Sequence, residues 1–216
     1  MPALLIIETS TEAASIALAV DGEIIEERSF TSDRRHNSLL FSPLAEIVKI
    51  HGSSDFDAVL VGSGPGSYSG TRVGIAAAQG AALVSACKAT AIPSILATAE
   101  AVSGEKCIAL GDARRGSFWL ANIEGGHLIS GPELLDDIAL EATISAAGEK
   151  NIPMFCMDKI RGKNTPLSLP TATGLWRAWQ NATPKTRALW AGAIPQPIYL
   201  KPPHITPGKQ KTHLSK

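Results

Sequence analysis

Residues 61–74, with the sequence VGSGPGSYSGTRVG, form the stretch that most constrains how this chain can fold. The segment Asp57–Val61 at its start is rich in β-branched residues and predicts a buried strand. Glycines at 62, 64 and 66 allow unusual backbone conformations and the close approach of another group. The small residues Gly74 to Ala86 then predict a helix, whose first turn would present unpaired N–H groups. The loop is therefore either a phosphate-binding turn or a place where another backbone segment packs tightly.

Several well-known motifs are absent from this loop. No lysine lies between Lys49 and Lys88, which excludes the P-loop pattern G-x-x-x-x-G-K-[ST]. Ser67 or Tyr68 stands where a Rossmann fingerprint requires glycine, and the acidic residue expected about 20 positions later is missing. The G-x-S-x-G pattern of serine hydrolases is not supplied either. The common motif-based explanations of a glycine-rich turn therefore do not apply.

The string from Gly64 to Gly74 resembles the motif G-P-G-S-[FY]-[ST]-G-x-R-[IV]-G of the TsaB (YeaZ) family. The resemblance spans roughly residues 3–204 and is strongest in the first hundred, whereas residues 133–194 match loosely. It implies an α/β fold of two RNase H-like lobes, as in the actin/Hsp70/sugar-kinase (ASKHA) superfamily. Four further segments match in the same order: residues 5–18, 35–40, 112–116 and 197–203.

The order of predicted elements also favours two lobes, because one plan occurs twice. Three strands joined in part by a two-residue glycine hairpin precede a helix and a further strand in each half. We therefore expect an N-terminal lobe at 1–103, a smaller C-terminal lobe at 104–201, and a basic, flexible tail at 202–216. The first set of strands is at 3–8, 14–20, 23–30 and 57–61, with a helix at 36–50 that Pro43 kinks or starts late. The second set is at 106–110, 118–123, 127–130 and 154–157, with a helix at 134–147.

Composition and charge limit the classes of function. With 44% hydrophobic residues the chain can bury a core, and no apolar stretch reaches the ~18 residues of a membrane span. The start of the sequence has no signal-peptide pattern, and the three cysteines are too widely spaced for a zinc or redox motif. We therefore expect a cytoplasmic protein. Residues 1–103 hold 6 basic and 11 acidic residues, whereas residues 104–216 hold 14 and 9, so the first half is a poor candidate for direct RNA binding.

The turn Glu8-Thr9-Ser10-Thr11 follows the first predicted strand. In ATPases of the ASKHA superfamily the matching turn carries an Asp that organises metal and water, and hydroxyls that hold phosphate. Glu8 replaces the Asp usual in the TsaB family, which moves the carboxylate by about one methylene and weakens the case for a strict metal site. We therefore interpret this turn as structural or vestigial, together with the other candidate phosphate-binding residues, Gly64, Pro65 and Gly66.

The five histidines offer no metal site, since none lies three or four residues from another. The catalytic TsaD family, which is related to TsaB, carries a metal-binding His-x-x-x-His shortly after its Gly-Pro-Gly helix. Thr98 and Val102 stand at the matching positions here, and neither binds a metal tightly. We therefore expect no catalytic residues, no metal and no cofactor.

The predicted helix after the loop has small residues at a spacing of four: Gly70, Gly74, Ala78 and Ala82. Such a face allows a second helix to approach closely, either within the chain's own lobe or in a partner. The resemblance favours a partner, because TsaB-like proteins pair with TsaD and form homodimers through these N-terminal helices. The interface residues it implies are His36, Leu39, Leu40, Pro43, Ser69, Gly70, Arg72, Val73, Gly74, Ala77, Ala78 and Ala81, with Leu39 and Leu40 as apolar anchors if exposed.

Two groups in the second half have simpler explanations. Asp112, Arg114 and Arg115 form either a charged site at the interlobe cleft or a solvated turn. The four tryptophans, at 119, 176, 179 and 190, all fall within the expected second lobe and are expected to form its core.

The resemblance implies a non-catalytic scaffold and dimerisation subunit that binds and stabilises TsaD, which threonylcarbamoylates the tRNA adenosine next to the anticodon. A TsaE-like ATPase would be a further partner, tRNA would be reached only through the complex, and the chain alone would form a homodimer. The alternatives are a small ATPase or kinase of the ASKHA fold, or a peptidase.

Overall fold

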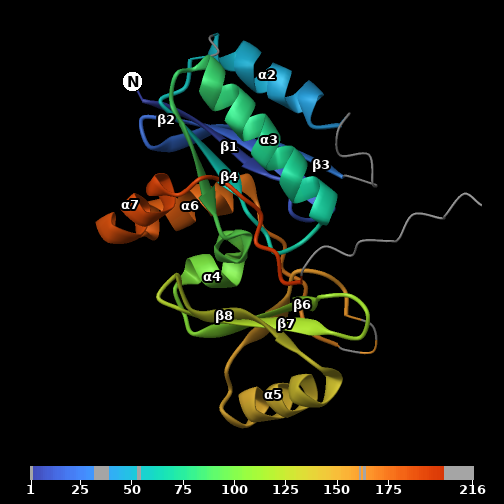
Figure 1. The fold of residues 1–216 in the computed structure, drawn as a ribbon. Coiled ribbons are helices and arrows are strands. Elements are labelled where there is room, and N and C mark those ends of the chain that lie inside the picture. The colour runs from blue at the N-terminus through green and yellow to red at the C-terminus, as the bar shows by residue number, and fades with distance from the viewer. Residues whose placement is uncertain (1, 32–38, 53–54, 161, 163, 202–216) are drawn as a thin grey trace, which may run out of the picture.

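The computed structural model describes residues 2–31, 39–52, 55–160, 162 and 164–201 and contains two separate β-sheets, one above the other in Figure 1. The first sheet has the strand order β3-β2-β1-β4-β5. Its first three strands form an antiparallel meander, and β4 and β5 extend it in parallel. Asp21 and Gly22 both adopt positive φ, as the predicted hairpin between β2 and β3 requires. The strands are β1 (Ala3–Glu8), β2 (Ala13–Val20), β3 (Glu23–Thr31), β4 (Ala58–Gly62) and β5 (Lys88–Ile92).

The second sheet repeats this plan with the order β8-β7-β6-β9. Strands β6, β7 and β8 form the meander, and β9 pairs with β6 in parallel. Gly125 and Gly126 take the positive φ values of the predicted hairpin. The prediction of two RNase H-like sheets is therefore confirmed. The strands are β6 (Cys107–Asp112), β7 (Phe118–Glu124), β8 (His127–Leu135) and β9 (Met154–Cys156).

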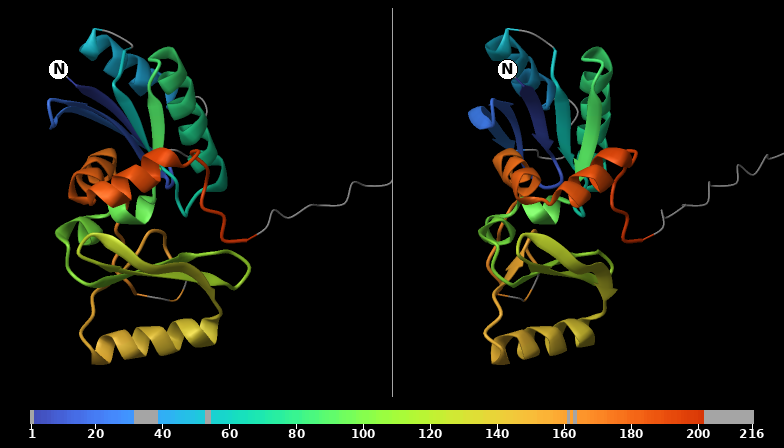
Figure 2. Two further views of the ribbon diagram at one scale, coloured as in Figure 1. Left: turned by 60° about the vertical axis from the view of Figure 1, so that its left-hand side comes forward. Right: turned by 90° about the vertical axis from the view of Figure 1, so that its left-hand side faces the viewer.

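Helices cover both faces of the first sheet. Helices α2 and α3 pack on one face and α6 on the other, while α5 packs on the second sheet (Figures 1 and 2). Neighbouring residues of β1 accordingly enter different cores, with Leu5 and Ile7 beneath α2 and α3 and Ile6 on the side of α6. This two-sided burial explains the continuous apolar sequence of β1. The helices are α2 (Phe41–His51), α3 (Tyr68–Val84), the 3₁₀ helix η1 (Ser94–Ala97), α4 (Ala99–Ser103), α5 (Asp137–Glu149), α6 (Ala172–Asn181) and α7 (Pro184–Gly192).

Capping residues explain where some boundaries differ from the prediction. Helix α3 begins at Tyr68 instead of Gly74, because the Ser67 hydroxyl accepts the Gly70 N–H. Helix α5 begins after Asp136, which accepts the Ala139 N–H, so the segment to Leu135 extends β8. Helix α2 begins at Phe41 with Pro43 in its first turn, and residues 36–38 of the predicted helix lie outside the described residues.

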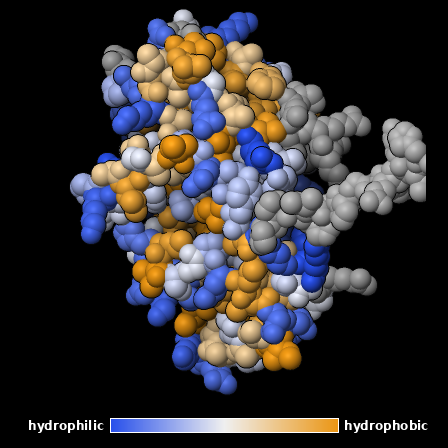
Figure 3. Space-filling model, in the orientation of Figure 1, coloured by the Kyte–Doolittle hydropathy of each residue, from blue (hydrophilic) through white to orange (hydrophobic). Residues whose placement is uncertain are grey.

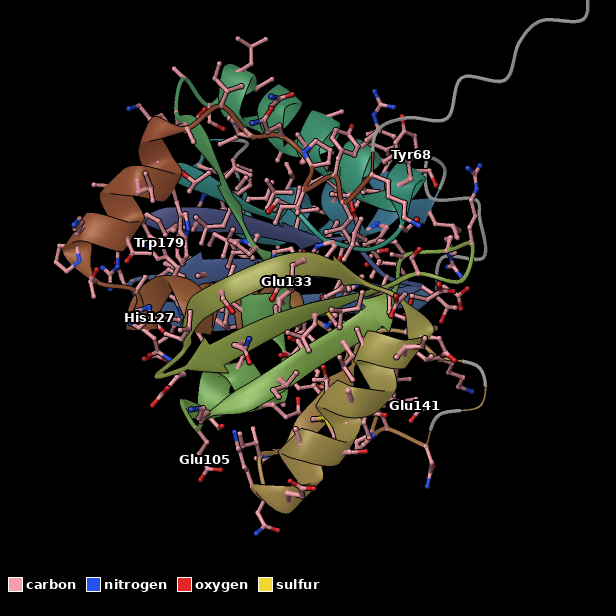
Figure 4. All side chains as sticks on the ribbon, turned by 60° about the horizontal axis from the view of Figure 1, so that its bottom comes forward. Tyr68, Glu105, His127, Glu133, Glu141 and Trp179 are labelled. Atoms are coloured by element: carbon pink, nitrogen blue, oxygen red, sulfur yellow. The ribbon has the colours of Figure 1, made fainter. Side chains whose placement is uncertain are left out.

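The position of α6 corrects the prediction that all four tryptophans form the core of the second lobe. Trp176 and Trp179 lie on α6, which packs on the first sheet, and the Trp176 indole Nε1 donates to the Gly22 carbonyl at 3.1 Å. Figure 4 shows Trp179 pointing toward α7, where its ring packs at a tilted angle against Trp190 with 6.4 Å between centroids. Residues 172–192 therefore pack with the first sheet, although they were expected within the C-terminal lobe at 104–201. Trp119 does lie in the second sheet, buried in a core to which both sheets contribute.

None of the helices in the described parts of the chain is long and apolar enough to cross a membrane.

Candidate functional site

A cleft of about 740 Å³ lies between the two sheets, and the predicted turns meet there. Strands β1 and β4 are parallel neighbours, so the turn after Glu8 and the glycine-rich loop after Gly62 emerge at the same edge of the sheet. The second sheet contributes the turn between β6 and β7. The lining residues from these three segments are Ser10, Thr11, Glu12, Pro65, Gly66, Ser67, Tyr68, Ser69, Thr71, Asp112, Ala113 and Arg114.

Glu8 does not line this cleft, although its turn does. Its side chain is fully buried against Gly62, and its Oε1 accepts the Ser10 N–H at 2.6 Å. Its Oε2 has no hydrogen-bond partner in the structure. Burial raises the pKa of Glu8 above its ordinary value, because desolvation disfavours the charged form more than the hydrogen bonds from Ser10 favour it. A carboxyl group held in this way is not available to organise a metal ion or a water molecule in the cleft.

The polar groups of both turns are largely used in bonding to each other. The Thr9 hydroxyl donates to the Gly70 carbonyl at 2.8 Å, and the Ser67 N–H donates to the Ser10 carbonyl at 2.6 Å. A side chain at Gly66 would overlap that same Ser10 carbonyl. These contacts favour the second interpretation of the loop, in which another backbone segment packs tightly against it.

The far side of the loop is fixed in the same way. The Gly64 N–H donates to the Ser94 hydroxyl at 2.9 Å, and the Ser94 N–H donates back to the Gly64 carbonyl at 2.9 Å. Pro65 is buried between these contacts and the cleft. Thr11, at the end of the first turn, donates its hydroxyl to the Ala13 carbonyl at 3.1 Å. A vestigial phosphate-binding role for these residues stays a prediction.

The charged turn of the second sheet reaches the cleft. Asp112 accepts both the backbone N–H of Arg114, at 2.6 Å, and its guanidinium, at 2.9 Å. The Asp112 N–H in turn donates to the Asp158 carboxylate, whose pKa is raised chiefly by burial. Arg114 and Arg115 both adopt positive φ, and both side chains are exposed. Asp112 and Arg114 thus line the interlobe cleft, as one of the two predicted alternatives requires, whereas Arg115 is not among its lining residues.

The described residues contain no cluster of histidine, cysteine and carboxylate side chains that could hold a metal ion. Thr98, at one position where TsaD-like proteins carry a metal ligand, is buried and donates its hydroxyl to the Ile95 carbonyl. The residues present therefore do not fit a metal of that kind.

A second concave surface, an apolar groove, lies between α2 and α3. It has a volume of about 530 Å³ and is almost entirely apolar. Figure 3 shows apolar side chains gathered over these helices at the top of the molecule. Phe41, Leu44 and Val48 follow the three-to-four-residue spacing of one helix face, which is the signal that could have revealed it. The lining residues are Phe41, Leu44, Val48, Phe56, Val73, Ala76, Ala77, Gly80, Ala81 and Val84.

The burial of several predicted interface residues within the chain corrects part of the predicted partner interface. Leu40 is fully buried, so it cannot serve as an exposed anchor. Gly70, Gly74 and Ala78 face the chain's own sheet, and a side chain at Gly74 would overlap the Thr9 hydroxyl. Their close packing is therefore internal. The remaining predicted residues are accessible at least in part and stay predictions: Leu39, Pro43, Ser69, Arg72, Val73, Ala77 and Ala81. His36 lies outside the described residues.

Comparison with known proteins identifies the family. The family model described as TsaD, tRNA N6-adenosine threonylcarbamoyltransferase, matches residues 23–183. The tRNA threonylcarbamoyladenosine biosynthesis protein TsaB of Escherichia coli is 31% identical over 127 residues, 56% of this chain and 54% of that protein. TsaB of Haemophilus influenzae is 32% identical over 126 residues, 56% of this chain and 53% of that protein. The chain thus spans about half the length of these curated relatives.

Two solved structures from Pseudomonas aeruginosa share the fold. One is YeaZ, with a TM-score of 0.68 and 22% identity, and the other is an uncharacterized protein similar to peptidase YeaZ, with a TM-score of 0.72 and 23% identity. Each covers 93% of this chain and 100% of the solved chain. Because the family model covers well over half of the sequence, the chain belongs to the TsaD family of tRNA N6-adenosine threonylcarbamoyltransferases, as a member of the TsaB (YeaZ) type.

Proposed function

We propose that this chain is a non-catalytic subunit that binds a TsaD-like catalytic subunit in the biosynthesis of threonylcarbamoyladenosine in tRNA. The observation that carries the proposal is the apolar groove between α2 and α3. Exposed apolar surface of this kind marks sites where another protein binds. Its shallow wall of Ala76, Ala77, Gly80 and Ala81 allows a partner helix to approach closely.

The choice of a TsaD-like occupant follows from the family match. Residues 23–183 match the TsaD model, and this range contains both α2 and α3. A TsaD-type chain therefore carries equivalent helices and can present an equivalent face. Two such faces would pair about an approximate twofold axis, as isologous interfaces do. A homodimer of this chain would use the same groove and would compete with TsaD for it.

The turns at the cleft support a non-catalytic role. Glu8 is buried beside Gly62, and the Thr9 hydroxyl and the Ser67 N–H are bonded within the chain. Metal chemistry and catalysis would then belong to the partner, and a TsaE-like ATPase would act on the assembled pair. The site of action would be the cytoplasm, where tRNA is modified, and tRNA would be reached only through the complex.

The test is reconstitution with TsaD, TsaE and the separate synthase that would supply threonylcarbamoyl-adenylate, all from the same organism. We expect this chain to co-purify with TsaD, and we expect tRNA modification to require it. A complete reaction without this chain would contradict the proposal. So would a failure to bind TsaD at concentrations low enough for a homodimer of this chain to dissociate and leave the groove free.

A small ATPase remains the second candidate, because the cleft of about 740 Å³, which polar residues line in part, is large enough for a nucleotide. The isolated chain is expected to hydrolyse no ATP above background. Steady turnover that is abolished by Glu8→Ala would support the ATPase and refute the scaffold.

A further inference from the structure

Residues Pro197–Lys201, which we term the clasp, lie along the interlobe cleft and form part of its lining. They follow α7, which packs on the first sheet, and the chain then turns toward the second sheet (Figure 2). The clasp therefore passes from one lobe to the other within five residues. Neither the sequence motifs nor the proposed function accounts for this course.

The first half of the clasp is attached to the first lobe. The Ile198 N–H donates to the carbonyl of Ser63, directly after β4, at 2.8 Å. The Tyr199 ring packs on the Tyr68 ring, with 5.8 Å between the centroids. Tyr68, labelled in Figure 4, is the first residue of α3. The Arg72 guanidinium lies 4.8 Å from the Tyr68 ring centroid and also donates to its hydroxyl, which holds this ring in place.

The second half contacts the core shared by the two sheets and then the second lobe. The Leu200 side chain packs against the core that the two sheets share. The Lys201 Nζ donates to the Arg114 carbonyl at 2.9 Å, in the turn between β6 and β7. Arg114 takes a left-handed backbone conformation, and its carbonyl also accepts the Ser117 N–H. Consecutive residues thus bind the glycine-rich loop, α3, the shared core and the opposing turn.

We propose that the clasp holds the two lobes together across the cleft and restricts entry to it. It fixes the separation of the loop at Ser63 and the turn at Arg114, which lie on opposite lobes. A ligand that needs a wider cleft must first displace the clasp. This device depends on contacts within the chain and does not rest on the proposed TsaD partner.

The test measures the distance between the lobes by double electron–electron resonance. Spin labels are placed at Ala45→Cys on α2 and Ser145→Cys on α5, both exposed, in a Cys87→Ser background. The remaining cysteines, Cys107 and Cys156, are buried and unreactive under native conditions. The perturbed protein carries Tyr199→Ala and Lys201→Ala, and the matched control carries Tyr199→Phe and Lys201→Arg.

We expect the alanine pair to add a population with a longer interlobe distance and to speed hydrogen exchange of the Ile198 amide by about tenfold, whereas the control keeps the parent behaviour. An unchanged distance distribution alongside faster Ile198 exchange would overturn the proposal, because the clasp would then lie on the surface without restraining the lobes. An unchanged Ile198 exchange rate would overturn it as well. Thermal unfolding checks that each variant folds, and Lys201→Ala alone replaces the pair if the pair does not.

Discussion

Replacing Ala77 or Ala78 with leucine tests the groove with two adjacent positions that face opposite ways. Ala78 is fully buried between α3 and the first sheet, in a core with Ile75 and Ala82. Ala77 is half-buried and lines the groove. The same added volume therefore enters the core at one position and the proposed interface at the other.

The expected magnitudes follow from this packing. Overpacking at Ala78 should cost about 1–3 kcal/mol of folding stability. For a chain of this size, each kcal/mol lowers the melting temperature by about 2–4 °C. Leucine at Ala77 has space in the free chain, so its effect on stability should stay within about 0.5 kcal/mol. In a complex it would hold the partner helix away, and a similar overpacking cost of about 1.4–2.8 kcal/mol corresponds to a 10- to 100-fold weaker affinity.

The assay combines thermal unfolding of each free variant with calorimetric titration against TsaD. Gln79→Leu is the matched control, because Gln79 is exposed on the same helix and does not line the groove. Ala77→Leu should weaken binding with little change in melting temperature, and Ala78→Leu should do the reverse. If Ala77→Leu binds TsaD as tightly as the parent and the Gln79→Leu control, the groove is not the interface and the reasoning is refuted.

Three further changes test the packing around the first sheet. Gly62→Ala should lower the stability of the free chain by about 1–3 kcal/mol in chemical denaturation, because its methyl group would overlap the Glu8 carboxylate. Burial raises the pKa of Glu8, so the folded protein loses stability as the pH rises above the ordinary carboxyl pKa of 4.5. Glu8→Gln should therefore be more stable than the parent at pH 7–8, and unfolding curves below that pKa should show no such advantage. Glu27→Ala should cost about 1–2 kcal/mol, measured the same way, because the Glu27 carboxylate accepts both the N–H and the hydroxyl of Thr173 at the start of α6; Glu23→Ala, on the same strand and exposed, should be nearly neutral.

The sheets could be predicted because their signals are local. Asp21-Gly22 and Gly125-Gly126 each occupy a turn whose backbone requires positive φ, and the apolar runs on either side fix the strands that these turns connect. The twice-repeated order then determines which strands pair. The boundaries that shifted are those set by a single hydrogen bond at a helix cap, as at Ser67 and Asp136, which the apolar pattern does not encode.

The placement of α6 could not be predicted, because its partners are distant in sequence. Trp176 bonds to Gly22, and Thr173 bonds to Glu27, across about 150 residues. No periodicity within α6 distinguishes the first sheet from the second. Which side of α3 packs on the sheet could not be predicted either, for a different reason. Alanine and glycine occur on every side of this helix, so the sequence lacks the contrast between apolar and polar faces that orients other helices.

The glycines of the 61–74 segment show why a motif match identifies this fold more securely than it identifies an activity. The space beside Gly62 is filled by the Glu8 carboxylate, that beside Gly66 by the Ser10 carbonyl, and that beside Gly74 by a Thr9 hydroxyl. A side chain at any of them would separate the loop from the first turn, whether or not a phosphate ever binds there. Close packing alone therefore explains why glycine is needed at these positions. The evidence on activity must come instead from groups that packing leaves free, and at this turn the carboxylate that would act is buried with a raised pKa. For this reason ATP turnover by the isolated chain and its dependence on Glu8 decide between scaffold and enzyme, and the motif does not.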